Sequence, residues 1–307
     1  MKIGYPCINL SLKCRSSRTF RLKNYSEKRL IATIESNLKC LQQILNYNRE
    51  RCILFFRITS DLIPFASHPI MKFDWQDYFK LKFREISKYI KQNNMRITMH
   101  PGQYTVLNSK NLRVVANSIK ELQYHANVLD LLGLDLTAKI MTHIGGVYGD
   151  KSASIKRFKK IYKTLESPIK RRYVIENDDK SYNLSDCAKI SETEGIPLVL
   201  DVYHHECFNS GLSLSNAFEL CLHSWKDIDG IPIVHYSSQH PTKGKPTHAD
   251  NIDLNHFNEF IKMTKNFDFD LMLEIKDKEQ SALQAIKFVK NDSRFSKLNQ
   301  SIHYIKI

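Results

Sequence analysis

Short apolar runs alternate with longer amphipathic stretches along the whole chain, and this alternation constrains the fold more than any other feature. A short apolar run bounded by polar residues is typical of a buried strand, whereas apolar residues three or four positions apart are typical of a helix. We predict strands near residues 2–5, 52–58, 96–100, 139–144, 173–177, 197–202, 231–236 and 270–275. We predict helices near residues 27–47, 75–92, 111–132, 152–166, 184–194, 213–225, 254–265 and 279–290.

This alternation predicts an α/β fold with a parallel sheet. Eight strand-helix units in a chain of 307 residues, with no linker rich in Gly, Ser or Pro, favour a closed (β/α)8 TIM barrel. An open, doubly wound sheet is the structural alternative. We expect a single domain over residues 1–307, with a tail at 291–307 that fits neither the strand nor the helix pattern.

Metal-competent side chains recur near the ends of six consecutive predicted strands: His100, His143, Glu176, Asp201, His204, His235, His248 and Glu274. In a parallel barrel these ends open on one face, so residues far apart in the sequence would converge there. A single histidine after a strand is more often structural. Carboxylates such as Glu176 and Glu274, however, are costly to hold close together unless cations neutralise them. The joint pattern predicts a polynuclear metal cluster at the C-terminal face of the strands.

The ligand types narrow the metal and the chemistry. Imidazole and carboxylate without thiolate suit Mn²⁺, Fe²⁺ or Zn²⁺ better than a pure Mg²⁺ or Ca²⁺ site. Two or three such ions could clamp a phosphodiester, lower the pKa of bound water, and stabilise the attacking and leaving oxygens. The same ions could polarise a sugar for isomerisation, so the ligands alone indicate either a nuclease or a sugar isomerase.

The charge of the chain separates these two possibilities. Lys and Arg number 46 against 32 Asp and Glu, a net charge of +14, which indicates attraction to a polyanion such as nucleic acid. The loops after the first and seventh strands carry basic residues that would lie on the same face as the metal ligands: Lys13, Arg15, Arg18, Arg21, Lys23, Lys243 and Lys245. Because these charges could follow a DNA backbone, they favour a nuclease.

Cysteines and apolar segments indicate the compartment. Seven cysteines with no C-x-x-C pair argue against a zinc ribbon, a redox motif or a disulfide framework. No segment approaches the roughly 18 apolar residues that a membrane span needs, and the N-terminus has no signal-like apolar run. We expect a soluble cytoplasmic monomer with no membrane partner.

Six blocks stand out along the chain: residues 4–10 (GYPCINL), 100–104 (HPGQY), 176–179 (ENDD), 201–205 (DVYHH), 235–239 (HYSSQ) and 272–276 (MLEIK). Together, in this order and over essentially the whole chain, they resemble the UV damage endonuclease family. The resemblance implies a TIM barrel with a manganese-type cluster, in which Zn²⁺, Fe²⁺ or Mg²⁺ could replace Mn²⁺. It implies ATP-independent cleavage of double-stranded DNA immediately 5′ of cyclobutane pyrimidine dimers and 6-4 photoproducts, which leaves a 3′-hydroxyl and a 5′-phosphate and initiates repair.

The resemblance also implies roles for individual residues. The eight candidate ligands match the family's metal ligands, and Glu176 should bridge two ions. The catalytic residues would be Glu176, Glu274 and Lys276, with Lys276 placed to neutralise the scissile phosphate. Four residues match positions that the family uses at the lesion: Tyr5, Asn9, Gln103 and Tyr104.

One departure concerns strand seven. Relatives often read Pro-Lys-x-His there, whereas this chain has Pro232-Ile233-Val234-His235. An apolar side chain cannot donate a charge or a ligand, so we expect the third metal site, around His204 and His248, to be the weakest.

Alternative functions remain open from the sequence. An apurinic/apyrimidinic endonuclease of the endonuclease IV type shares a three-metal barrel and a similar HPGQY block, and is the closest rival. A sugar isomerase would not need the basic loop after the first strand. A non-catalytic DNA-binding protein would not need this many metal ligands.

Overall fold

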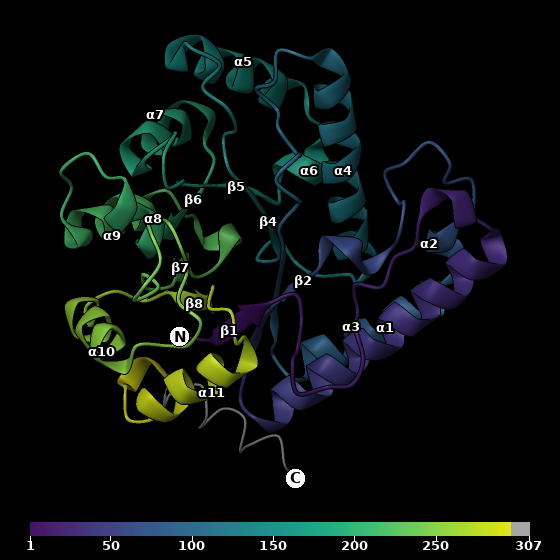
Figure 1. The fold of residues 1–307 in the computed structure, drawn as a ribbon, viewed down its shortest axis with the longest axis horizontal. Helices are drawn as coiled ribbons and strands as arrows, with labels where there is room; N and C mark the ends of the chain where they lie inside the picture. The colour runs from purple at the N-terminus through teal and green to yellow at the C-terminus, as the bar shows by residue number, and fades with distance from the viewer. Residues whose placement is uncertain (296–307) are drawn as a thin grey trace.

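The computed structural model describes residues 1–295 and shows parallel strands that close into one barrel in sequence order, with helices around them (Figure 1). The strands are β1 (Ile3–Pro6), β2 (Phe55–Ile58), β3 (Arg96–Met99), β4 (Lys139–Thr142), β5 (Tyr173–Glu176), β6 (Leu198–Asp201), β7 (Ile233–Tyr236) and β8 (Asp270–Leu273). β1 pairs with β8 as well as with β2, which closes the sheet. The predicted TIM barrel is therefore confirmed, and the open sheet is excluded.

Helices connect the strands on the outside of the barrel. They are α1 (Glu27–Glu50), α2 (Trp75–Tyr78), α3 (Lys80–Gln92), α4 (Leu112–Leu131), α5 (Lys151–Thr164), α6 (Ser167–Lys170), α7 (Leu184–Glu194), α8 (Val202–Cys207), α9 (Leu214–His223), α10 (Leu254–Met263) and α11 (Glu279–Phe288). Three short 3-10 helices lie at Leu22–Asn24, Ser60–Leu62 and Asp227–Asp229. The sequence did not predict α8, which begins directly after β6 because the Asp201 carboxylate caps it by accepting from the His204 amide at 2.7 Å.

Alternate strand residues point into the barrel, and there they form two layers. The lower layer is apolar and fully buried: Phe55, Met141, Val174, Val199, Ile233 and Met272. Two positions further along the same strands the chain has Arg57, His143, Glu176, Asp201, His235 and Glu274. Because side chains two residues apart on a strand share a face, this polar layer lies above an apolar floor, at the C-terminal mouth of the barrel.

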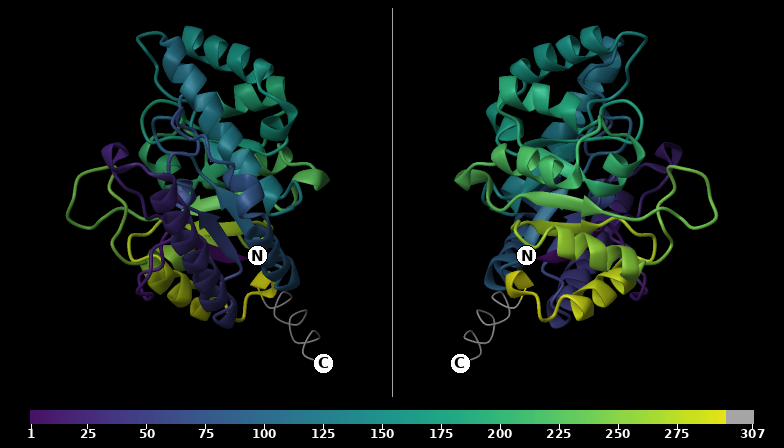
Figure 2. Two further views of the ribbon diagram at one scale, coloured as in Figure 1. Left: turned by 90° about the vertical axis from the view of Figure 1, so that its right-hand side faces the viewer. Right: turned by 90° about the vertical axis from the view of Figure 1, so that its left-hand side faces the viewer.

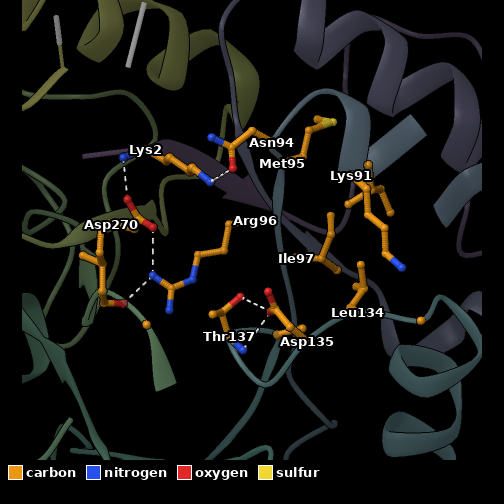
Figure 3. Close-up of a pocket in the computed structure, with 15 residues that line it drawn as sticks. Lys2, Lys91, Asn94, Met95, Arg96, Ile97, Leu134, Asp135, Thr137 and Asp270 are labelled. Carbon is orange, nitrogen blue, oxygen red and sulfur yellow. Dashed lines mark hydrogen bonds and ion pairs between the residues drawn. The ribbon is translucent and has the colours of Figure 1, made fainter. Parts of the chain in front are cut away.

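The opposite pole is closed by buried ion pairs. Lys139 pairs with Asp229 at 2.5 Å, and Arg96 on β3 pairs with Asp270 on β8 at 2.8 Å. A cavity of about 530 Å³ opens beside Arg96 and is also lined by Lys2 (Figure 3). These residues lie at the N-terminal ends of the strands, so this cavity is separate from the polar mouth.

The loops after β1 and β7 project from the same side of the molecule (Figure 2). The β1 loop is held by buried side chains: the Glu279 carboxylate accepts from the Leu10 and Ser11 amides at 2.9 and 2.8 Å, and Asn37 bonds to the Arg18 backbone. The basic residues of this loop therefore stand on an anchored backbone.

A disulfide joins Cys14 in this loop to Cys40 in α1. The cysteine pattern argued against a disulfide framework, and it did not predict this single bond. The reason is the fold: the loop turns back along α1, and the Cα atoms of two residues 26 positions apart come to 5.7 Å. The other five cysteines are free.

The N-terminus meets the last described residues at the bottom of the barrel. The amino group of Met1 donates to the Arg294 carbonyl at 2.8 Å, and Phe295 is buried in the core. Of the predicted tail, residues 296–307 lie outside the described part. Among residues 1–295, no helix is both long enough and apolar enough to cross a membrane.

Candidate metal centre

Each of four predicted histidine ligands is oriented by a backbone carbonyl. The Nδ1 atoms of His100, His143, His204 and His248 lie 2.8, 3.4, 3.0 and 2.8 Å from the carbonyl oxygens of Pro101, Glu176, Asn177 and Glu274. A carbonyl can only accept, so Nδ1 carries a proton, and in the neutral form of the ring the lone pair lies on Nε2. This is the arrangement by which a protein fixes the tautomer of a metal-binding histidine.

Glu176 lies at the centre of the polar layer and is buried. His235 Nδ1 donates to its Oε1 at 2.6 Å. Its Oε2 lies 3.3 Å from His100 Nε2 and 4.0 Å from His143 Nε2, yet it accepts no hydrogen bond from the described residues. Because His100 donates through Nδ1, the neutral form of its ring turns the lone pair of Nε2 toward a lone pair of the carboxylate. A cation between these two atoms would turn that repulsion into two bonds.

The candidate ligands form two overlapping clusters whose ligand atoms lie within 4.8 Å of one another. One cluster contains His100, His143 and Glu176, and the other contains Glu176, Asp201, His235 and Glu274. Glu176 belongs to both. Asp201 Oδ2 is a second buried carboxylate oxygen without a hydrogen bond within residues 1–295. The donor set and its unsatisfied oxygens fit divalent metal ions.

His204 and His248 adjoin these clusters without belonging to either. The His204 ring lies 5.7 Å from that of His143 and 5.8 Å from that of His248, between ring centroids. Tyr203 contributes to this placement: its hydroxyl accepts from the Thr247 amide at 2.9 Å, and its ring lies edge-on to His248 at 5.1 Å. The structure thus brings all eight predicted ligands to one mouth.

Arg57 is a member of this centre that the sequence analysis missed. Its Nη1 lies 2.7 Å from Glu274 Oε1, and its Nη2 donates to His235 Nε2 at 2.9 Å. A signal was present: Arg57 follows Phe55 by two positions in an otherwise apolar strand, and a buried arginine is almost never unpaired.

The charges of these groups shift one another's pKa values. Burial alone would raise the pKa of Glu176, but the imidazoles of His235 and His143 hold it well below its usual range. Against the same effect of burial, Arg57 and then His235 lower the pKa of Glu274. Burial raises the pKa of Asp201, although His204 opposes the shift. Glu176 and Glu274 are therefore ionised at neutral pH.

Lys276 lies at the rim of the mouth. Its Nζ pairs with Asp250 Oδ1 at 2.7 Å, and both side chains are about half exposed. Asp250 also accepts from His240 Nε2 at 3.0 Å. Lys276 thus contacts a rim carboxylate and none of the eight candidate ligands.

The four predicted lesion-contacting residues fall into two groups. Tyr5 and Asn9 are buried: the Tyr5 hydroxyl donates to Asn48 at 2.7 Å and accepts from Asn9 at 2.8 Å. Tyr5 shares with Ile3 the face of β1 that packs against α1 and not the face of the polar layer, and its contact with a lesion stays a prediction. Gln103 and Tyr104 are exposed, and Tyr104 retains 83% of its accessible surface.

Comparison with known proteins identifies similar chains. A family model described as UV-endonuclease UvdE matches residues 1–304. A protein of Clostridium perfringens named UV DNA damage endonuclease is 41% identical over 292 residues, which cover 94% of this chain and 71% of that protein. A protein of the same name from Bacillus thuringiensis subsp. konkukian is 33% identical over 297 residues, which cover 94% of this chain and 94% of that protein.

Solved structures give a parallel result. The crystal structure of SacUVDE is 43% identical, with a TM-score of 0.91, and the match covers 95% of this chain and 98% of that one. Endonuclease IV from Thermus thermophilus matches with a TM-score of 0.58 at 11% identity over 95% of this chain and 98% of its own. A D-psicose 3-epimerase matches equally well, at a TM-score of 0.58 and 12% identity over 96% of this chain and 100% of its own. The last two matches show the fold alone.

Proposed function

The chain belongs to the UV-endonuclease UvdE family, and on this premise we propose that it is a UV DNA damage endonuclease whose cleavage depends on divalent metal ions held at the barrel mouth. One observation carries the metal dependence: the buried Glu176 Oε2 faces the lone pair of His100 Nε2 at 3.3 Å without a hydrogen bond. Leaving a buried carboxylate oxygen unsatisfied is costly, and a cation would remove that cost.

The residues of the mouth suggest how the ions would be held. His100 and His143 would bind one ion with Glu176, and Asp201, His235 and Glu274 would bind another with the same carboxylate. The rings of His204 and His248 would complete a third position. We propose Mn²⁺ as the preferred metal, with Zn²⁺, Fe²⁺ or Mg²⁺ as alternatives.

When bound, such ions neutralise a phosphodiester and lower the pKa of the attacking water. The protein's own part is to fix the ligand rings through their Nδ1 bonds and to exclude water from below through the apolar floor. We propose that the bond cleaved lies immediately 5′ of a cyclobutane dimer or a 6-4 photoproduct, and that the products carry a 3′-hydroxyl and a 5′-phosphate. Lys276, at the rim, would approach the DNA backbone and not the ligands.

Damaged duplex DNA would bind across the mouth. The anchored, basic β1 loop and the β7 loop project on one side, where their lysines and arginines would contact phosphates (Figure 2). Gln103 and Tyr104 follow the ligand His100 on an exposed turn, so they would enter the duplex where the lesion has weakened stacking.

The direct test is denaturing-gel mapping of cleavage on matched duplexes that are undamaged, UV-irradiated or abasic, each with Mn²⁺ and with a chelator. We expect a single nick 5′ of the photoproduct that requires Mn²⁺. Preferred cleavage of the abasic duplex would instead support an endonuclease IV-type activity, and equal cleavage in the chelator would refute metal dependence.

A further inference from the structure

Arg57 places a permanent positive charge among the candidate metal ligands. Only 5% of its surface is exposed, and its guanidinium contacts Glu274 Oε1 at 2.7 Å, His235 Nε2 at 2.9 Å and Met141 Sδ at 3.8 Å. A guanidinium does not lose its proton in proteins, so this charge is present at every working pH.

The position of this charge matters because three carboxylates converge at the mouth. They are Glu176, Asp201 and Glu274, and within residues 1–295 Arg57 is the only lysine or arginine that forms an ion pair with any of them. The floor beneath is apolar, and strand seven contributes Ile233 to it. Arg57 therefore stabilises the carboxylate cluster in the protein without metal.

The same contacts compete with metal. His235 and Glu274 belong to the four-residue cluster, and Arg57 already uses a Glu274 oxygen and a His235 ring nitrogen. A divalent ion at this cluster would share the oxygen and meet a like charge a few ångströms away. His100, His143 and Glu176 form no hydrogen bond or ion pair with Arg57 among the described residues, although the charge of Arg57 acts on Glu176 at longer range.

We propose that Arg57 is a positioning residue that preassembles Glu274 and His235 before metal binds and weakens metal binding at their cluster. The His100 cluster then fills first. This inference rests on the proposed metal dependence of the enzyme and adds an order of occupancy to it.

The test separates two effects of opposite sign. In Arg57→Gln, the metal-free protein should unfold at a lower temperature, because its carboxylates lose their fixed counter-charge. The dissociation constant of the second Mn²⁺ to bind, measured from the electron paramagnetic resonance of free Mn²⁺, should fall at least about tenfold, because a like charge has been removed. Arg57→Lys keeps the charge and should retain the parental dissociation constant.

A matched control is Arg96→Gln, which removes another buried strand arginine, paired with Asp270 at 2.8 Å at the opposite pole. This variant should lose stability without any change in Mn²⁺ affinity. If Arg57→Gln does not fold without metal, the loaded protein is titrated with a chelator and yields the same constant. Unchanged or weaker Mn²⁺ binding in Arg57→Gln would overturn the role proposed for Arg57 and leave the proposed function intact. A parental protein that binds no Mn²⁺ would overturn the proposed metal dependence itself.

Discussion

Replacing both Gln103 and Tyr104 with alanine tests how the enzyme finds its lesion. Tyr104 is 83% exposed, and neither side chain makes a hydrogen bond within residues 1–295. Their removal should therefore change the free energy of unfolding by no more than about 0.5 kcal/mol, as for other surface substitutions. Neither residue is a candidate ligand, so the metal content should stay the same.

The expected loss lies in discrimination between damaged and intact DNA. Stacking of an aromatic side chain on a base contributes about 1–3 kcal/mol, which corresponds to a roughly five- to 150-fold loss when it is removed. Because the two residues share one turn next to His100, their effects should not add, and a loss within this range is expected for the double variant.

The assay compares dissociation constants and nicking rates on irradiated and undamaged duplexes of one sequence, at one salt concentration. Phe288→Ala is a matched control, since Phe288 is a 41% exposed aromatic at the end of α11, away from the mouth. Undiminished preference for irradiated DNA in the double variant would refute the insertion of these residues and leave an ordinary surface turn.

Other predictions concern the metal centre and the core. Glu176→Gln should abolish metal-dependent nicking on denaturing gels, because it removes the charge shared by both clusters; parental activity in a folded variant would contradict the bridging role. Mild chelation followed by metal analysis should remove first the ion held by His204 and His248, and three tightly held ions per chain would show that Ile233 has no effect on occupancy. Burial lowers the pKa of His125 to about 4, so the unfolded chain takes up the proton first as pH falls below 6.5. Stability should then drop by about 2 kcal/mol between pH 7 and 5 in urea unfolding, and an equal drop in His125→Asn would assign that slope to other groups.

The sequence predicted the barrel because eight short, mainly apolar runs alternate with amphipathic stretches, and every predicted strand end lies within three residues of the observed one. The ligand set followed from the same pattern. His, Asp and Glu at the ends of parallel strands must share one face once the strands form a barrel.

Other features depended on which face of a strand each side chain takes and on contacts between residues far apart in the sequence. The sequence did not show that the Tyr5 side chain lies on the α1 side of β1, where its hydroxyl donates to Asn48. Cys14 and Cys40 are brought together by the path of a loop, which no local pattern encodes. The place of Arg57 could have been predicted, because its position two residues after Phe55 puts it in the layer of the candidate metal ligands.

Backbone carbonyls hold the histidine rings in place, so a glutamate side chain can be changed without moving a ring. The carbonyl that accepts from His143 belongs to Glu176, and the one that accepts from His248 belongs to Glu274. Both are backbone groups, so a change from glutamate to glutamine at either position leaves the ring orientation in place. Loss of metal in Glu176→Gln would then report the missing carboxylate charge and not a displaced His143. Retention of metal with loss of cleavage would instead assign Glu176 to the chemical step.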